Sequence, residues 1–366
     1  MKIDSYTHFA CPAFMDHLEA ESGHPMVFRG LFSSIPELSD IDLRIRHVCC
    51  CSVCIVHVYM DEHGIDVHCL VPLPWLECEP GLHADESKAL EACRIANDEM
   101  ARVVARFPDR LIGVALIPTT TEQAMIQETT RAVKELGMAG VALFVGPTAK
   151  PPDMACFEGL YRTCEELGAV VWMHPCRPQS YADYDAYKGE GSKHQIWNTF
   201  GWIYDTSVAM VHIALAGVFR RYPGLKVVTH HHGAMVPFFT ARFDTQRRNF
   251  QEVEGDDLLE DLRLFYCDTA TFGESAANIQ QAIDFFGKSQ VLFGTDTPMD
   301  MGTRGMFTRT TIASVEALGA APEDKESFYA GNVLDMLGER FAGIAGARGA
   351  VAARLKAYST RIAASL

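Results

Sequence analysis

The segment Ala169-Val170-Val171-Trp172-Met173-His174 is a short apolar run that ends in a histidine. Continuous apolar runs of this length are typical of strands that are buried on both faces of a parallel sheet. Seven further short runs, most of them rich in apolar or β-branched residues, occur along the chain, and each closes in a polar, glycine or proline turn. In order, the predicted strands are Lys2–Ser5, Val67–Leu73, Leu111–Ile117, Gly140–Val145, Ala169–Met173, Lys226–His230, Leu264–Cys267 and Gln290–Phe293.

Helical patterns separate these runs. In Lys88–Phe107 the apolar residues recur at spacings of three, four and seven, which puts them on one face of a helix. The other predicted helices are Glu122–Leu136, Ala155–Leu167, Asp205–Tyr222 and Ala276–Phe286. Eight strands that alternate with helices predict an α/β fold, and specifically a closed (β/α)8 TIM barrel. The alternative, a doubly wound open sheet, usually has a glycine-rich turn after its first strand, and this sequence has none there.

Two regions depart from the alternation, but the whole is expected to form one domain over residues 1–342. Loop insertions are predicted near 20–60 and 176–200, and the second, which is polar and rich in tyrosine and glycine, is expected to lie over the mouth of the barrel. Residues 343–366 are rich in alanine and arginine and are predicted to form a C-terminal helical extension.

The composition excludes several classes of function. The 366 residues carry a net charge of −15, which would repel the backbone of a nucleic acid or an anionic membrane surface. No stretch approaches the roughly 18 to 20 apolar residues of a membrane span, and no signal peptide is evident, so a cytoplasmic protein is expected. The 12 cysteines are too sparse for a disulfide scaffold and are expected to be reduced thiols.

Polar groups stand at the carboxyl ends of four predicted strands, where barrels carry their functional side chains. His8 follows the first strand, His174 ends the fifth, His230–His232 end the sixth, and Asp296 follows the eighth. A single histidine at a strand end is more often a hydrogen-bonded structural residue. Three imidazoles and one carboxylate converging on one point instead predict a site for Zn²⁺ or a similar divalent ion. Such an ion would also attract an anionic substrate locally, against the repulsion from the net negative charge of the chain.

Several motifs resemble those of the amidohydrolase superfamily. They are Lys2-Ile3-Asp4 with Thr7-His8, the run Met60-Asp61-Glu62-His63-Gly64-Ile65-Asp66, Met173-His174-Pro175, His231-His232-Gly233-Ala234 with Pro237, and Gly294-Thr295-Asp296 with Pro298. The resemblance extends from residue 2 to about Leu337. It is strongest to the branch of aminocarboxymuconate-semialdehyde decarboxylase and the related aromatic-acid decarboxylases. It implies a barrel of the metal-dependent hydrolase type.

The resemblance also implies roles for individual residues. His8, His174 and Asp296 match the metal ligands of the family, and Asp296 is counted among its catalytic residues. His231, six residues before Pro237, matches the acid/base residue, which acts over a metal-bound water. The cofactor is then a divalent metal, with zinc the first choice and manganese the second. The partners implied are a small carboxylate substrate and further copies of the chain in a homodimer or homotetramer.

Two features depart from the family pattern. Family members usually begin with His-x-His or Glu-x-His, whereas this chain has Tyr6 before His8. Three outcomes follow: a site of His8, His174, Asp296 and waters, which we favour; a phenolate ligand from Tyr6; or loss of the metal. The second departure is a cysteine-rich insertion over residues 47–59, in which three adjacent cysteines lack the spacing of zinc sites, so an apolar insertion is expected there.

Further residues are candidates for binding the substrate or supporting the site. A guanidinium fork matches two carboxylate oxygens, so the candidates for that role are Arg44, Arg46 and Arg177, with a solvated surface arginine as the alternative for each. Trp202 and Tyr204 are candidates for the pocket wall, with core packing as the alternative. Asp268 and His232 are expected to support the ligands from behind. Strand alternation predicts that His230 and His232 point away from the site.

These features predict a metal-dependent decarboxylase, a carbon–carbon lyase, for a small carboxylated aromatic or unsaturated substrate. A hydrolase or hydratase that acts on a similar substrate is the alternative, because it needs the same ligands. A catalytically inactive barrel, suggested by Tyr6, is the third hypothesis.

Overall fold

The computed structural model describes residues 1–9, 12–23, 59–74, 76–77, 79–177, 192–247, 258–270, 273, 275–299, 305–338 and 341. The candidate clamps Arg44 and Arg46, most of the cysteine-rich insertion and the C-terminal extension lie outside these ranges. Much of both predicted loop insertions lies outside them as well.

The core of the molecule is one sheet of eight parallel strands, paired in sequence order from β1 to β8. The strands are β1 (Ile3–Phe9), β2 (Val67–Pro72), β3 (Leu111–Leu116), β4 (Gly140–Val145), β5 (Val170–Pro175), β6 (Lys226–Thr229), β7 (Tyr266–Asp268) and β8 (Val291–Leu292). Backbone hydrogen bonds join the end of this sheet to its beginning, from Ser5 N–H to Phe293 O at 2.8 Å and from His8 N–H to Thr297 O at 2.7 Å. The predicted (β/α)8 barrel is therefore confirmed.

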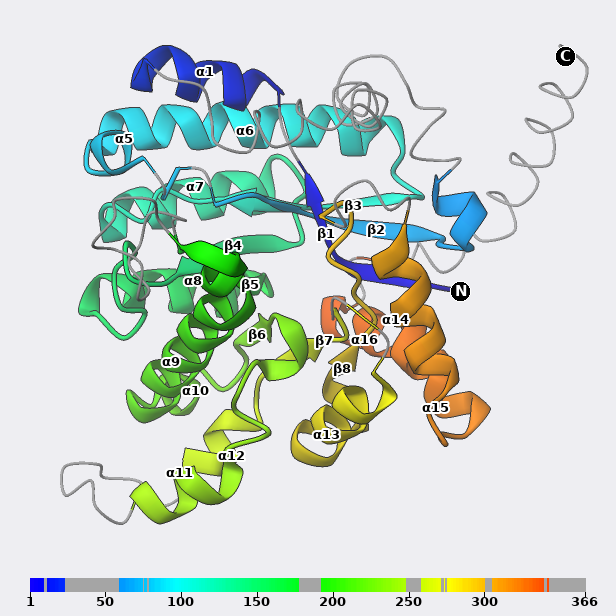
Figure 1. Ribbon diagram of the computed structural model, residues 1–366. Helices are drawn as coiled ribbons and strands as arrows, with labels where there is room; N and C mark the ends of the chain where they lie inside the picture. Colours follow the sequence, from blue (N-terminus) through cyan, green and yellow to red (C-terminus); the bar gives the residue numbers. More distant parts are fainter. Residues whose placement is uncertain are drawn as a thin grey trace, which may run out of the picture.

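Helices surround the strands, as Figure 1 shows. The α-helices are α1 (Pro12–Ser22), α5 (Pro80–His83), α6 (Glu86–Arg106), α7 (Glu122–Lys134), α8 (Glu158–Leu167), α9 (Trp202–Leu215), α10 (Val218–Arg221), α11 (Thr240–Arg247), α12 (Leu258–Leu262), α13 (Ala276–Phe286), α14 (Met306–Glu316), α15 (Pro322–Glu326) and α16 (Asn332–Leu337). Short 3₁₀ turns are η1 (Ala155–Phe157), η3 (Lys193–Gln195), η5 (His231–Gly233) and η6 (Lys288–Gln290), and π-helical turns are η4 (Trp197–Gly201) and η7 (Ser327–Gly331). Among the described helices, none is both long enough and apolar enough to cross a membrane.

The predicted elements match the observed ones closely, with two informative differences. Strand β1 continues four residues past its predicted end, to Phe9, so His8 lies inside a strand instead of after one. The helix predicted over Asp205–Tyr222 begins earlier and is broken into α9 and α10 at Gly217. Gly217 has a φ of +65°, a left-handed conformation that ends a helix and that glycine adopts without steric cost.

Glu77, in the loop after β2, has a buried carboxyl group. It is 1% exposed, and within the part of the chain that the structure describes neither of its oxygens has a hydrogen-bond partner on another residue. Burial raises the pKa of the Glu77 carboxyl to about 8, against an opposing contribution from its own backbone N–H. A folded-state pKa above the unfolded value means that folding favours the protonated form. The contribution of Glu77 to the free energy of unfolding is therefore fully present below about pH 4.5 and is lost as the pH rises through 8.

Replacing Glu77 with glutamine is expected to stabilise the protein at pH 9 and to change little at pH 5. The amide stays neutral, whereas the wild-type carboxyl must ionise in an apolar setting, and the difference is on the order of a few kcal/mol. Thermal unfolding of both proteins at the two pH values measures it. Glu91→Gln, at an exposed position of α6, is the matched control. An equal shift in melting temperature for Glu77→Gln at both pH values would contradict this account.

Candidate metal centre

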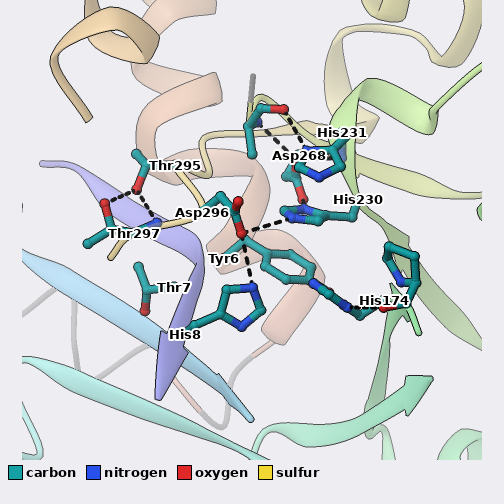
Figure 2. Close-up of polar contacts among 12 residues, drawn as sticks. Tyr6, Thr7, His8, His174, His230, His231, Asp268, Thr295, Asp296 and Thr297 are labelled. Carbon is teal, nitrogen blue, oxygen red and sulfur yellow. Dashed lines mark hydrogen bonds and ion pairs between the residues drawn. The ribbon is translucent and has the colours of Figure 1, made fainter. Parts of the chain in front are cut away.

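Four buried side chains from four different strands meet at the carboxyl end of the barrel. They are His8 on β1, His174 on β5, His230 directly after β6 and Asp296 after β8. One ligand atom from each lies within 4.8 Å of the corresponding atoms of the other three. Figure 2 shows their side chains pointing toward one another. Of the residues predicted for this site, His8, His174 and Asp296 are thus brought together.

His8 and Asp296 make the closest contact in this group. His8 Nε2 lies 2.9 Å from Asp296 Oδ1, and the other ring nitrogen of His8, Nδ1, is buried with no hydrogen-bond partner among the described residues. Burial opposes ionisation of Asp296, but hydrogen bonds from His230 and His8, and their charges, hold the pKa of this carboxyl well below its usual range. Asp296 therefore presents a carboxylate to the site.

His174 is held as a neutral imidazole. Its Nδ1 lies 2.6 Å from the carbonyl oxygen of Pro175, which accepts only if that nitrogen carries the proton. Burial, followed by the charges of His8 and His230, lowers the pKa of His174 well below its ordinary value. The lone pair is consequently on Nε2, and the hydrogen bond at Nδ1 fixes the orientation of the ring, as is usual for histidines that bind metals.

His230 also lies in this group, so the prediction that it points away is wrong. Its Nδ1 hydrogen-bonds to Asp268 and its Nε2 lies 3.2 Å from Asp296 Oδ1. Strand β6 ends at Thr229, and the next residues turn sharply: φ is +54° at His231 and +58° at His232. The alternation rule therefore does not extend to His230. Burial lowers its pKa, but the charges and hydrogen bonds of Asp268 and Asp296 outweigh this effect and raise it to about 9.

His231 lies one layer behind His230, with the two rings stacked at 3.7 Å. Its Nδ1 lies 3.0 Å from the carbonyl oxygen of Ala270. Burial and the charge of His230 lower the pKa of His231 to about 4. His231 also borders a cleft of about 290 Å³, together with His232, Asn198, Asn278 and Gln281. It therefore lies between His230 and an open cleft.

Asp268 fixes the positions of His230 and His231. Besides His230 Nδ1, its carboxylate accepts the backbone N–H groups of His231 at 3.0 Å and of Ala270 at 2.9 Å. All of these groups are buried, so the carboxylate fixes the orientation of His230 and the turn after β6 together. For His232, whose Nε2 is buried, the described residues offer this nitrogen no hydrogen-bond partner.

Tyr6 lies beside the four residues with its hydroxyl group already engaged. The O–H donates to the carbonyl oxygen of Met173 at 3.1 Å, and the ring stacks on His230 at 3.9 Å. Burial, then the negative charges of Asp268 and Asp296, raises the pKa of Tyr6 well above its ordinary value. The side chain is therefore a neutral phenol that packs against His230.

The candidates for substrate binding have different fates. Arg177 forms a two-point ion pair with Asp205, from Nε at 2.7 Å and from Nη2 at 2.8 Å, so this edge of its guanidinium is not open to a substrate carboxylate. Trp202 is buried, and its ring centre lies 5.7 Å from that of His174 in an edge-to-face contact. Tyr204 is 55% exposed on the outer side of α9. Trp202 thus adjoins the four residues through His174.

The donor set suits a divalent ion. Two ligands that each lie about 2.1 Å from one ion are about 3 Å apart when they subtend a right angle at it. The separation of Asp296 Oδ1 from His8 Nε2, 2.9 Å, is close to that value, and the ligand atom of His174 lies within 4.8 Å of both residues' ligand atoms. Imidazole nitrogens with one carboxylate are the ligands that Zn²⁺ and neighbouring transition metals take in proteins. The residues present therefore fit such an ion.

Comparisons with known proteins agree with this arrangement. The family model described as amidohydrolase matches residues 58–338. The 2-amino-3-carboxymuconate-6-semialdehyde decarboxylase of Dictyostelium discoideum is 27% identical over 285 residues, covering 76% of this chain and 74% of the relative. The 2-keto-4-carboxy-3-hexenedioate hydratase of Sphingobium sp. is 24% identical over 263 residues, covering 68% and 72%.

A solved structure has the same fold. It is the dihydroxybenzoic acid decarboxylase of Polaromonas sp. JS666, with bound manganese and the inhibitor 2-nitroresorcinol. The TM-score is 0.72 at 24% identity, and the match covers 92% of this chain and 96% of that one. The matched family model spans most of the barrel and includes His174, His230 and Asp296, and the chain therefore belongs to the amidohydrolase family.

Proposed function

We propose that this protein is a metal-dependent decarboxylase, a carbon–carbon lyase that acts on a small carboxylated aromatic or unsaturated substrate. The observation that carries the proposal is the convergence of His8, His174 and Asp296, with His230, at the open end of the barrel. Two of the similar proteins reported above are decarboxylases of carboxylated compounds, which favours this reaction among those of the family.

In this proposal His8, His174 and Asp296 hold the ion. A divalent ion bound there would attract the substrate carboxylate and an adjacent oxygen and would hold the substrate in place beside the proton donor. The chain as a whole is strongly negative, so this local positive charge is needed to bind an anion. The nitrogen-rich donor set favours zinc, and the manganese bound in the related structure makes that metal the rival candidate.

In this proposal His230, oriented by Asp268, delivers the proton that the reaction consumes. Decarboxylation needs a proton on the carbon that bears the carboxylate; the electron pair of the broken carbon–carbon bond then restores the π system, and carbon dioxide leaves. Asp268 holds the Nδ1 side of His230, so Nε2 is the nitrogen that faces the ligands and can hold or deliver that proton. His231, the residue expected from the sequence, stacks behind it and is the second candidate.

Trp202 is proposed as the surface against which the unsaturated part of the substrate lies. Its buried ring makes an edge contact with His174, so a planar substrate that reaches the ligands would meet an apolar face beside them. Arg177 is left out of this role because Asp205 already pairs with it.

Of the three outcomes left open for Tyr6, its geometry supports a site without a phenolate ligand. A phenol whose proton is donated to Met173 O, and whose ionisation burial opposes, is a poor metal ligand. It equally gives no reason to expect loss of the metal, because the other donors are in place. We further propose a homodimer or homotetramer, which sedimentation analysis would test.

Hydration of a similar substrate is the second candidate function, favoured by the similarity to a hydratase. The two reactions differ in their products, since only decarboxylation releases carbon dioxide. Purified protein is therefore incubated with hydroxybenzoates and muconate semialdehydes, while carbon dioxide release and substrate loss are followed together.

The expected result is release of carbon dioxide in step with substrate loss. A chelator should abolish the reaction, and added Zn²⁺ or Mn²⁺ should restore it. Substrate loss without gas would support the hydratase instead. Elemental analysis that finds no bound metal, with no turnover of any compound after metal addition, would support an inactive barrel.

A further inference from the structure

Strand β1 contains one residue more than its neighbour β2 between two matched positions. Asp4 pairs with His68 and Thr7 with Leu70, so Ser5 and Tyr6 lie opposite the single residue Cys69. Such a bulge leaves a backbone group without its partner in the sheet and redirects the side chains that follow. Here the N–H of Tyr6 donates to the carboxyl group of Asp4, at 3.3 Å from Oδ1. Asp4 thus supports the bulge that precedes His8.

The same carboxyl group reaches across the closing seam of the barrel to the segment after β8. Its Oδ1 accepts the backbone N–H of Thr295 at 3.0 Å, and its Oδ2 lies 2.5 Å from Thr295 Oγ1. Both residues are fully buried. Three polar contacts therefore converge on one carboxyl group, and all of them come from the two segments that carry His8 and Asp296.

The residue that follows Thr295 needs such support. Asp296 has a φ of +62°, a left-handed conformation that is unfavourable for residues other than glycine and persists only when its surroundings impose it. Its backbone N–H donates to Tyr6 O at 3.0 Å, which binds it to the bulge itself. Thr295 Oγ1 also lies 2.9 Å from Thr297 Oγ1. Thr297 Oγ1 in turn lies 2.9 Å from the Oγ1 of Thr308 on α14. Figure 2 shows Thr295 and Thr297 beside Asp296.

We infer that Asp4 and Thr295 are positioning residues, whose contact across the β1–β8 seam sets the separation of His8 and Asp296 and hence the affinity of the site for its ion. The inference rests on the metal site of the proposed function, but not on the reaction. Partners of this kind hold ligands at the correct distance and typically change metal affinity about 10- to 100-fold when they are removed.

The test compares cobalt binding by purified, metal-free variants. Thr295→Val removes the hydroxyl group and nearly keeps the shape, and Thr295→Ser restores the hydroxyl group. Thr129→Val on α7 is the matched control, because Thr129 is equally buried and its hydroxyl group has no hydrogen-bond partner in the part of the chain that the structure describes. Cobalt affinity and the visible absorption spectrum of the bound ion report on the ligands directly, and circular dichroism with thermal unfolding reports on the fold.

Thr295→Val is expected to fold and to bind cobalt about 10- to 100-fold more weakly, with an altered spectrum, whereas Thr295→Ser and Thr129→Val bind as wild type does. Wild-type affinity and spectrum in Thr295→Val would overturn the inference, as would equal losses in Thr295→Val and Thr129→Val. Should Thr295→Val fail to fold, Thr295→Ala, which also removes the hydroxyl group, decides in the same way by its cobalt spectrum. A wild-type protein that binds cobalt but releases no carbon dioxide would refute the proposed reaction alone.

Discussion

Replacing His174 with alanine is expected to remove both the bound metal and turnover. His174 contributes a neutral imidazole whose Nε2 lone pair is oriented by the hydrogen bond from Nδ1 to Pro175 O. Loss of one of three proposed ligands should reduce the metal content of the purified protein to a small fraction of one equivalent. Turnover should fall by about 10³-fold or more, because the ion supplies much of the electrostatic stabilisation.

Elemental analysis and carbon dioxide release on the same preparation measure both effects. His212→Ala is the control, since His212 is a half-exposed histidine on α9 that pairs with Asp153 on the outside of the barrel. A His174→Ala protein that keeps a full equivalent of metal would exclude His174 as a ligand, whatever its activity.

Replacing His230 with alanine is expected to lower kcat by about 10² to 10⁴-fold while the ion stays bound at saturating metal. That range is typical for removal of a general acid or base. His231→Ala should have a smaller effect, because the ring of His231 lies behind His230 and its Nδ1 side is turned to the carbonyl oxygen of Ala270. The measurement is kcat with metal content for each variant, together with Asp268→Asn, which should reproduce part of the His230 defect.

Two results would reverse these assignments. If His230→Ala loses metal as His174→Ala does, His230 is a fourth ligand. If His231→Ala loses turnover with its metal intact while His230→Ala stays active, the acid/base residue is His231, as the family pattern implies.

The fold could be predicted from the sequence because most of the strands are short apolar runs that alternate with amphipathic helical patterns, and eight such repeats are typical of a closed barrel. The convergence of His8, His174 and Asp296 followed from the geometry of a closed barrel, in which all strand ends share one rim. His230 was missed because the length of β6 depends on tertiary contacts. The strand stops at Thr229, and the carboxylate of Asp268 then fixes the direction of His230.

Arg177 illustrates the same limit for charged residues. Its type and its place after β5 fit a carboxylate clamp, but its partner, Asp205, lies 28 residues later on α9. Which anion an arginine meets is decided by helix packing, and a local pattern carries no information about it. The role of Tyr6 was open for a comparable reason, since a phenol becomes a ligand or a packing residue according to the acceptor within its reach.

The seam between β8 and β1 gives the protein a particular order of assembly. His8 and Asp296 are 288 positions apart in the chain (296 minus 8), yet they are in contact across the seam where β8 meets β1. During synthesis β1 leaves the ribosome before the other seven strands, and its His8 meets Asp296 only after nearly the whole barrel has followed. Contacts so distant in sequence form late because they close the longest loops. The capacity to hold a metal is therefore gained at the end of folding, so a nascent or truncated chain that lacks the last strand has no complete site with which to capture a stray cation.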